Sequence, residues 1–512
     1  MSMSILRNRS QELFSLPLDQ MNYGVAVADI DGDGRNEWIV AGFSGPNLVL
    51  RWENGQFVNI ALDNTPYAAL QDKKGQALGV AACDLTGDGR EEIYFVNGNM
   101  GYGGQILYRH SLFTWRDGAF VDLFEDEINS KVRVVVSGRS VGCVDRFGEG
   151  LYSFVVASYA ARGKGANALI EMDRQLSDAE KGLIVLKDTA EEAGIRRSAG
   201  GRMVFTGPLL GNGALQDILI LNEPNEFLEN EGRNFLFMNK GDGSFAEVGQ
   251  HYGLSDPVGE PRASALANLD EDGQWEILST NYGSAARLWT RNPEGRGWAD
   301  IGHQIQGLGG GVSEAGKARV AIFWDADNDG QPELFLGAFP DPPPTAPNRL
   351  LRLHLPSRSL YELDIGPALE PEGYVTGGAV GDLDGDGVLE LLLAHGEDVG
   401  QPLSLYGGTA AAESHWLRIA PLTAAGAPAR GSLVNVTRAD GSSAMFIIDP
   451  GAYLGHNEPV AHFAWLDSAA PPQRLRILWP CGHAINRAIL ESDWDQLHIV
   501  QHPSQSLPKD EL

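Results

Sequence analysis

Residues 29–37 have the sequence D-I-D-G-D-G-R-N-E, with carboxylates at loop positions 1, 3, 5 and 9 and glycines at positions 4 and 6. Alternating carboxylates suit a hard cation that prefers several oxygen ligands. Glycine lets the loop fold back, so that the side chains at positions 1, 3 and 5 converge. Because apolar residues precede and follow the stretch, it predicts a metal-binding turn between two strands.

The same pattern occurs five times along the chain, beginning at residues 29, 84, 268, 325 and 382. The expected side-chain ligands stand at positions 1, 3, 5 and 9 of each loop. They are Asp29, Asp31, Asp33 and Glu37; Asp84, Thr86, Asp88 and Glu92; Asn268, Asp270, Asp272 and Glu276; Asp325, Asp327, Asp329 and Glu333; and Asp382, Asp384, Asp386 and Glu390. The backbone carbonyl at position 7 is a further expected ligand, supplied by Arg35, Arg90, Gln274, Gln331 and Val388.

These loops differ from the EF-hand, which requires a bidentate glutamate at position 12. Position 12 is occupied by Val40, Phe95, Ser279, Leu336 and Leu393. All-oxygen ligation favours calcium over zinc, and a flexible loop favours calcium over magnesium. The alternative is a set of hairpin turns with solvent-facing acids, but converging carboxylates repel one another unless a cation lies among them. We therefore expect up to five calcium ions, held less tightly where Thr86 and Asn268 replace aspartate.

Two altered copies of the pattern lie between the second and third intact loops. Residues 145–150 (D-R-F-G-E-G) have Phe147 at position 3, and residues 209–217 retain only Asp217, at position 9. We expect neither altered copy to bind metal. With them, the pattern begins at residues 29, 84, 145, 209, 268, 325 and 382, so the chain consists of seven repeats of about 60 residues.

Each repeat contains four short strand-like segments separated by turn residues, which is typical of a β-propeller blade. We therefore predict an all-β fold with a seven-bladed propeller over residues 1–408. The last repeat ends at Tyr406 without a fourth strand, so residues 11–16 (Q-E-L-F-S-L) are predicted to be the outer strand that closes the ring. Residues 409–500 are predicted to form a small separate β-module, and residues 501–512 a tail.

The composition limits the classes of function. The formal net charge is −29, and the acidic loops account for part of it. No basic stretch offsets this charge, which argues against a nucleic-acid partner. No apolar run is long enough to span a membrane, and residues 1–20 lack the layout of a signal peptide. Of three cysteines, Cys83 and Cys143 are interpreted as small buried residues, with a bridge between them as the alternative in an extracellular protein.

Several segments resemble the cartilage acidic protein 1 family, whose FG-GAP/VCBS repeats are also found in the heads of integrin α-subunits. The resembling segments are 22–33, 45–50, 87–94, 168–173, 368–373, 394–405 and 458–463. Residues 416–480 resemble the ASPIC/UnbV module that follows the propeller in this family. The chain is similar to a bacterial-type member, or to one without the EGF-like domain of the vertebrate proteins. The resemblance implies a secreted, calcium-stabilised, non-enzymatic interaction protein with an integrin α-like propeller.

The histidines are scattered and lie outside any HExxH motif, and no serine stands in the strand–turn–helix context that a GxSxG nucleophile requires. We therefore expect a binding scaffold, with no catalytic residues, that acts as a monomer. A protein or glycan partner is expected on the face opposite the calcium loops, at linkers that include residues 223–231 and 341–344. The alternatives are a calcium-dependent polysaccharide lyase and a carbohydrate-binding propeller. An extracellular location follows from the resemblance; the alternatives are the cytoplasm, or the endoplasmic reticulum if the terminal K-D-E-L of residues 509–512 is functional.

Overall fold

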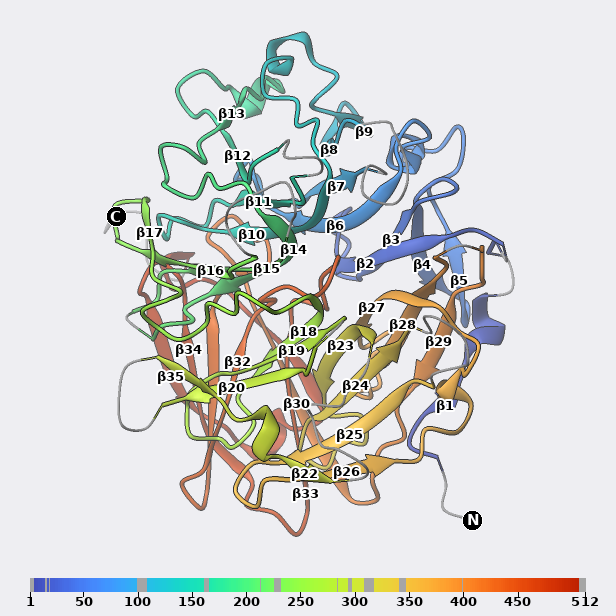
Figure 1. Ribbon diagram of the computed structural model, residues 1–512, viewed down its shortest axis with the longest axis vertical. Helices are drawn as coiled ribbons and strands as arrows, with labels where there is room; N and C mark the ends of the chain where they lie inside the picture. Colours follow the sequence, from blue (N-terminus) through green and yellow to red (C-terminus); the bar gives the residue numbers. More distant parts are fainter. Residues whose placement is uncertain are drawn as a thin grey trace.

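The computed structural model describes residues 4–13, 16–17, 19–98, 108–160, 165–211, 213–224, 232–282, 284–292, 297–307, 317–339, 347–397 and 399–505. These residues form β-strands and short 3-10 helices, as Figure 1 shows. The linker segments 225–231 and 341–344 and the terminal K-D-E-L of residues 509–512 lie outside the described residues. Among the described residues, no helix has the length and apolar character needed to cross a bilayer.

Residues 7–407 form sheets that follow the predicted repeats, and the consecutive strands of each repeat form an antiparallel meander. The first four sheets contain β2 (Asn22–Ala28), β3 (Glu37–Gly42), β4 (Leu48–Glu53) and β5 (Gln56–Asn59); β6 (Ala77–Cys83), β7 (Glu92–Asn97), β8 (Ser111–Arg116) and β9 (Ala119–Asp122); β10 (Gly138–Val144), β11 (Ser153–Ser158), β12 (Ala168–Met172) and β13 (Leu186–Asp188); and β14 (Gly200–Gly207), β15 (Asp217–Glu223), β16 (Phe235–Asn239) and β17 (Phe245–Glu247).

The next three sheets continue the series. They contain β18 (Pro261–Ala267), β19 (Glu276–Asn281), β20 (Arg287–Arg291) and β21 (Trp298–Asp300); β23 (Ala318–Trp324), β24 (Glu333–Ala338), β25 (Arg349–His354) and β26 (Ser359–Leu363), with β22 (Gln306–Gly307) added in parallel; and β27 (Val375–Gly381), β28 (Glu390–His395) and β29 (Ser404–Gly407), with β1 (Arg7–Asn8). The 3-10 helices of this region are η1 (Ser10–Leu13), η2 (Ala68–Gln71), η3 (Glu127–Asn129), η5 (Ala179–Lys181), η6 (Gly302–Gln304) and η8 (Gly366–Leu369).

The first strand of each sheet packs against the first strands of its neighbours. β2 contacts both β6 and β27, and the contacts continue through β10, β14, β18 and β23. An apolar cluster lies between successive sheets; one of them joins Val25 and Val27 of the first sheet to Ala379 and Leu392 of the seventh. The first strands, which lead into the loops, are therefore buried over most of their length.

The prediction that residues 11–16 form the outer strand of the last sheet is wrong. β1 takes this place instead, with Arg7 opposite Gly407 and Asn8 opposite Tyr406. The strand ends because the side chain of Asn8 accepts the backbone N–H of Ser10 at 2.8 Å, in an Asx-type turn. The apolar Leu13 and Leu16, which suggested a strand, are buried in the cluster between the first and seventh sheets. Leu13 belongs to the 3-10 helix η1 and not to a strand.

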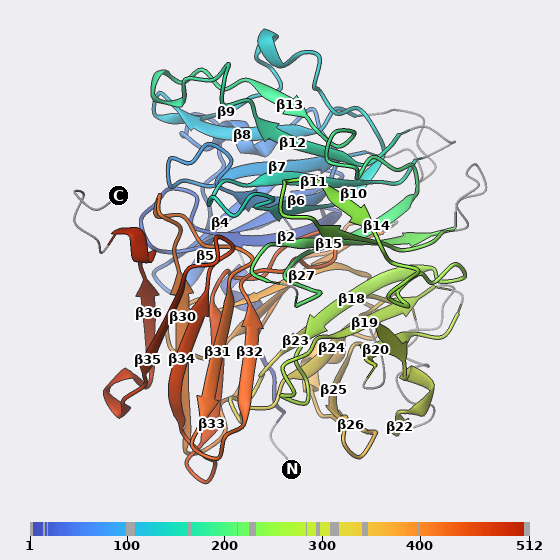
Figure 2. The ribbon, with the colours of Figure 1, turned by 90° about the vertical axis from the view of Figure 1, so that its left-hand side faces the viewer.

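After β29 the topology changes to two sheets with one shared core. One sheet contains β30 (Ser414–Pro421), β33 (Ala461–Leu466) and β36 (Gln496–Val500); the other contains β31 (Leu433–Arg438), β32 (Ser443–Ile447), β34 (Pro472–Leu478) and β35 (Ala484–Ala488); η9 (Glu491–Asp493) and η10 (Pro503–Gln505) accompany them. Their buried core includes Leu417, Val434, Leu475 and Trp479. We call these two sheets the C-terminal sheets; Figure 2 shows them in orange and red below the first sheets.

The connection between β32 and β33, residues 448–460, lies among the first strands of the preceding sheets. Leu454 accepts the backbone N–H of Val80 at 2.9 Å, and His456 exchanges backbone hydrogen bonds with Val25 and Val27. A Cβ atom at Gly24 would lie 1.9 Å from the carbonyl oxygen of Leu454, so only glycine permits this approach. Backbone hydrogen bonds from this connection therefore join the C-terminal sheets to the first strands.

Candidate metal-binding loops

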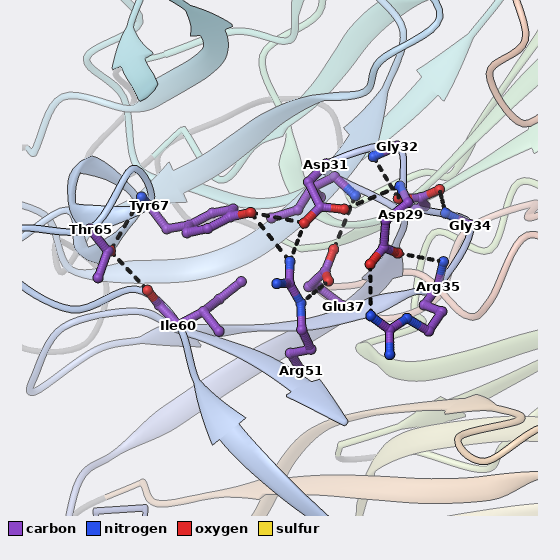
Figure 3. Close-up of polar contacts among 12 residues, drawn as sticks. Asp29, Asp31, Gly32, Gly34, Arg35, Glu37, Arg51, Ile60, Thr65 and Tyr67 are labelled. Atoms are coloured by element: carbon purple, nitrogen blue, oxygen red, sulfur yellow. Dashed lines mark hydrogen bonds and ion pairs between the residues drawn. The ribbon is translucent and has the colours of Figure 1, made fainter. Parts of the chain in front are cut away.

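The loop of residues 29–37 turns around the carboxylate of Asp29 (Figure 3). This carboxylate accepts the backbone N–H groups of Gly32 at 2.8 Å, Asp33 at 3.1 Å and Gly34 at 2.9 Å. Gly32 and Gly34 have φ angles of 76° and 85°, which glycine adopts without strain. The turn brings one carboxylate oxygen each of Asp29, Asp31 and Asp33 to within 4.8 Å of one another.

An arginine of the third strand lies beside this cluster. The Nε of Arg51, in β4, donates to Oε1 of Glu37 at 2.8 Å, and its Nη2 is paired with Asp31. The hydroxyl of Tyr67 donates to Asp31 at 2.8 Å (Figure 3). Burial raises the pKa of Glu37 to about 7, although Arg51 acts in the opposite direction. Glu37 therefore contacts the arginine and lies outside the three-acid cluster.

Three of the other four intact loops also bring three acids together, but in these the glutamate at position 9 is a member of the cluster. The clusters are Asp270, Asp272 and Glu276; Asp325, Asp327 and Glu333; and Asp382, Asp384 and Glu390, with ligand oxygens within 4.8 Å of one another. The predicted ligands Asp329 and Asp386 are not members of these clusters. Their carboxylates accept the backbone N–H groups of the position-7 residues Gln331 and Val388, at 2.9 and 2.8 Å.

The loop of residues 84–92 does not form a three-acid cluster among the described residues. Asp84 accepts backbone N–H groups from Gly87 at 2.6 Å and Gly89 at 2.9 Å, so the turn itself is present. Thr86 replaces the second acid, and its hydroxyl donates to Glu92 at 3.4 Å.

The residues at position 7 of the intact loops make the same backbone contact. The backbone N–H groups of Arg35, Arg90 and Gln274 each donate to the acid at position 5 of their own loop.

Asn268 also departs from the expected role of a ligand. Its side-chain amide donates to the carbonyl oxygen of Gln274 at 2.7 Å, so the two predicted ligands contact each other. Burial, with the charges of Asp270 and Asp272, raises the pKa of Glu276 to about 8.

Arginines that the sequence analysis did not identify also contact two further loops. Arg352 of β25 lies opposite Glu333 in the sheet register and pairs with it and with Asp329, at 2.8 Å. Arg9 donates to Glu390 at 2.6 Å and to Asp384 at 3.0 Å. Arg51 and Arg352 occupy the same position in the third strands of their repeats. This recurrence is visible in the sequence and could have indicated the two arginines.

In the altered loop 145–150 the turn is retained without the cluster. Asp145 accepts the backbone N–H groups of Glu149 at 3.0 Å and Gly150 at 2.6 Å. The guanidinium of Arg146 is paired with Glu171 of β12 at 2.9 Å, and both side chains are largely buried. In this loop, backbone N–H groups therefore bind the buried Asp145, and Arg146 pairs with the second acid, Glu171.

The altered loop 209–217 keeps its one acid in a similar way. Asp217 accepts the backbone N–H groups of Leu210 at 3.0 Å and Asn239 at 2.9 Å, and burial raises its pKa to about 6. Neither altered loop belongs to a three-acid cluster in the described part of the chain.

The C-terminal sheets cover the side of the molecule on which these loops lie. Arg418 of β30 pairs with Asp382 at 2.8 Å, and Arg430 pairs with Glu91 at 2.7 Å. His462 contacts Asn328 of another loop at 2.9 Å. The sequence analysis did not predict this coverage, because it depends on contacts between residues far apart in the chain.

Cys83 of β6 and Cys143 of β10 form a disulfide between neighbouring first strands. The interpretation of both as free, small buried residues is therefore wrong, and the alternative of a bridge is confirmed. The third cysteine, Cys481, is free and exposed.

Comparison with known proteins identifies an FG-GAP-like repeat in the N-terminal part of the chain. Residues 29–95, which contain the first two intact loops, match the family model described as FG-GAP-like repeat. Cartilage acidic protein 1 from Xenopus tropicalis is 42% identical over 498 residues, covering 95% of this chain and 74% of that protein. The human protein of the same name is 40% identical over 496 residues, covering 94% and 72% of the two chains. The chain belongs to the cartilage acidic protein 1 family.

Similarity to solved structures is much weaker. A rhamnogalacturonan lyase from Bacillus licheniformis aligns with 76% of this chain and 72% of its own, at 16% identity and a TM-score of 0.40. This similarity has no bearing on the activity of the chain.

Proposed function

We propose that this protein is a calcium-binding, non-enzymatic interaction scaffold. The observation that carries the proposal is the recurrence of three-acid clusters at equivalent loops of four different sheets. Carboxylate oxygens are the ligands that calcium prefers. Arginines support the proposal as well, because Arg51 pairs with Asp31 and Arg352 with Glu333, and such pairs would orient the acids as outer-shell groups do at metal sites.

Bound calcium would supply positive charge to acids that otherwise repel one another. The cluster acids of four loops would hold an ion each, and Asp84, Asp88 and Glu92 would hold a fifth, weaker one. Asp29 and its equivalents have two tasks, since they also fix the backbone turn. The C-terminal sheets cover these loops. We therefore expect calcium, by ordering the loops, to strengthen the contacts that hold the C-terminal sheets in place.

Isothermal titration calorimetry of chelator-treated protein tests this proposal. We expect four to five calcium ions per chain, with magnesium binding clearly more weakly. Asp327→Ala should remove one ion, and Asp145→Ala, in an altered loop, should remove none. Absence of calcium binding, or equal binding of magnesium, would show that the clusters are only surface turns.

We propose that the sheets of residues 7–407 form a seven-bladed propeller closed by β1. The packing of β27 against β2 and the apolar cluster between the first and seventh sheets support this arrangement. Deletion of residues 1–9 would remove β1 and leave β29 as an exposed edge. We expect aggregation or a lower melting point. A monomeric truncation with the parental melting point would contradict closure.

We propose that a protein or glycan partner docks on the side opposite the acidic loops. This follows from the coverage of the loops by the C-terminal sheets. The connections between second and third strands vary in length there, from residues 43–47 to residues 224–234 and 339–348. Recognition segments tend to differ in this way.

Replacing residues 226–231 and 341–344 with short Gly/Ser linkers tests the docking side. The readouts are a glycan array, a panel of extracellular proteins and the melting point. The parent should bind a component that the linker variants lose, with the melting point unchanged. Retained binding would place the docking site elsewhere.

We propose an extracellular location for the protein. The Cys83–Cys143 disulfide supports this, because such bonds persist in oxidising compartments. Alkylation of protein from its natural source, followed by mass spectrometry, should find only Cys481 modified. Modification of all three cysteines would contradict the proposal.

A further inference from the structure

Three metal-ligating side chains converge in the C-terminal sheets, in a cluster separate from the acidic loops. Cys481 and His483 lie in the turn between β34 and β35, and His502 follows β36. The Sγ atom of Cys481 is 3.4 Å from Nδ1 of His483 and 3.3 Å from Nε2 of His502. All three ligand atoms lie within 4.8 Å of one another.

The turn holds the cysteine and the first histidine on the same side. Trp479 and His483 close the turn with a backbone hydrogen bond of 2.9 Å, and Gly482 has a φ of 87°, which favours glycine. The backbone N–H of His483 points to Sγ of Cys481 at 3.4 Å. The turn therefore places the sulfur and Nδ1 of His483 close together, and the thiolate is the form of cysteine that binds metals.

His502 is fixed from its other ring nitrogen. Its Nδ1 lies 2.7 Å from the hydroxyl of Ser504 and accepts the backbone N–H of Ser504 at 3.3 Å, so Nε2 is the ring nitrogen that faces Cys481. The residue is only 8% exposed and packs edge-on against Trp479. Zinc at Nε2 would require the ring proton on Nδ1, from where it can donate to the Ser504 hydroxyl, and hydrogen bonds at the outer nitrogen also orient the histidines that bind metals.

The spacing of the ligand atoms suits zinc. With Zn–S of about 2.3 Å and Zn–N of about 2.05 Å at tetrahedral angles, sulfur and nitrogen lie roughly 3.6 Å apart. The two distances at Cys481 are 0.2 to 0.3 Å shorter than this, so small side-chain rotations would admit the ion. Thiolate and imidazole ligands select zinc and not calcium.

We propose that Cys481, His483 and His502 bind one zinc ion, with the fourth position open to water. Binding would transfer the thiol proton of Cys481 to solvent, because the thiolate is the ligand. The ion would tie the β34–β35 turn to the segment after β36. This site is independent of the calcium proposal, since it shares no residue with the acidic loops.

Cobalt substitution tests the site on the full chain. Chelator-treated protein is saturated with calcium, which occupies the carboxylate sites, and is then titrated with cobalt(II). We expect one equivalent that gives a thiolate-to-cobalt charge-transfer band and intense tetrahedral visible bands, both removed by zinc. Zinc, but not calcium, should protect the single free thiol from iodoacetamide.

Matched variants identify the ligands. Cys481→Ser should abolish the charge-transfer band, and His502→Gln should weaken zinc binding roughly tenfold or more. His303→Gln, which changes an exposed histidine of η6, should leave both unchanged. No charge-transfer band in the parent, or the same band in Cys481→Ser, would show that the cluster is only a hydrogen-bonded Cys–His group.

Discussion

The acidic loop after β23 and the altered loop after β10 share one backbone turn and hold their acids by different means. In each, the aspartate at position 1 accepts backbone N–H groups from positions 5 and 6. The donors are Asp329 and Gly330 for Asp325, at 3.0 and 2.7 Å, and Glu149 and Gly150 for Asp145, at 3.0 and 2.6 Å. The same turn therefore forms both with and without a three-acid cluster.

The two loops differ at positions 3 and 9. The loop after β23 has Asp327 and Glu333 there, and the altered loop has Phe147 and Ser153. Only the first arrangement gathers acids into a cluster. The comparison teaches that the first aspartate shapes the turn, whereas the later acids gather the negative charge that we propose a cation balances.

Removing the first aspartate from each loop should have the largest effect. Asp325→Ala loses the turn and the ion together, so we expect about 4 kcal/mol of destabilisation in calcium. Asp145→Ala should cost about 1–3 kcal/mol, because only the turn is lost. Thermal unfolding with calcium and with chelator measures both. An equal dependence on calcium in the two variants would contradict the comparison.

A later acid separates the ion from the turn. Asp327→Ala should lower stability by about 2–3 kcal/mol in saturating calcium and change it little in chelator. Denaturant unfolding under the two conditions checks this. A similar loss in chelator would mean that Asp327 acts through its contacts with Arg352 and not through an ion.

The arginines should matter most when calcium is absent. Arg352→Gln leaves the buried Glu333 without its partner, so we expect roughly 1–3 kcal/mol of destabilisation in chelator and less in calcium. The control is Arg174→Gln, which breaks an exposed pair with Glu149 of the altered loop and should cost about 0–1 kcal/mol. Equal effects of the two substitutions would argue against a role for Arg352 in the cluster.

The pH dependence of calcium binding should be smaller but distinctive. In the metal-free protein, burial and neighbouring carboxylates raise the pKa of Glu276 and Glu390 from 4.5 to about 8. Stability from these raised values is present below pH 4.5 and is lost as the pH rises through about 8. Calcium requires the carboxylates, so its affinity at each of these two loops should fall roughly fiftyfold from about pH 8 to about pH 6. Titration calorimetry at both values checks this; a constant affinity would exclude proton competition.

The sequence predicted the repeating strands and loops well because both depend on short-range patterns. Apolar strands and glycine-containing acidic turns are encoded within each repeat, and the altered loops were found by their spacing. The family resemblance was confirmed by relatives that cover most of the chain.

Features that depend on distant contacts were not predicted. The place of β1 was missed because Leu13 and Leu16 resemble strand residues until their packing is known. The contacts of residues 448–460 with the first strands, and the coverage of the loops by Arg418 and Arg430, have no local signal.

The most direct test of the calcium proposal is the melting point of the parent chain in excess calcium and in excess chelator. The proposal predicts a clear rise with calcium, because an ion that binds only the folded state stabilises it by mass action. Magnesium at the same concentration should protect much less. An unchanged melting point, or equal protection by magnesium, would contradict calcium binding by the acidic clusters.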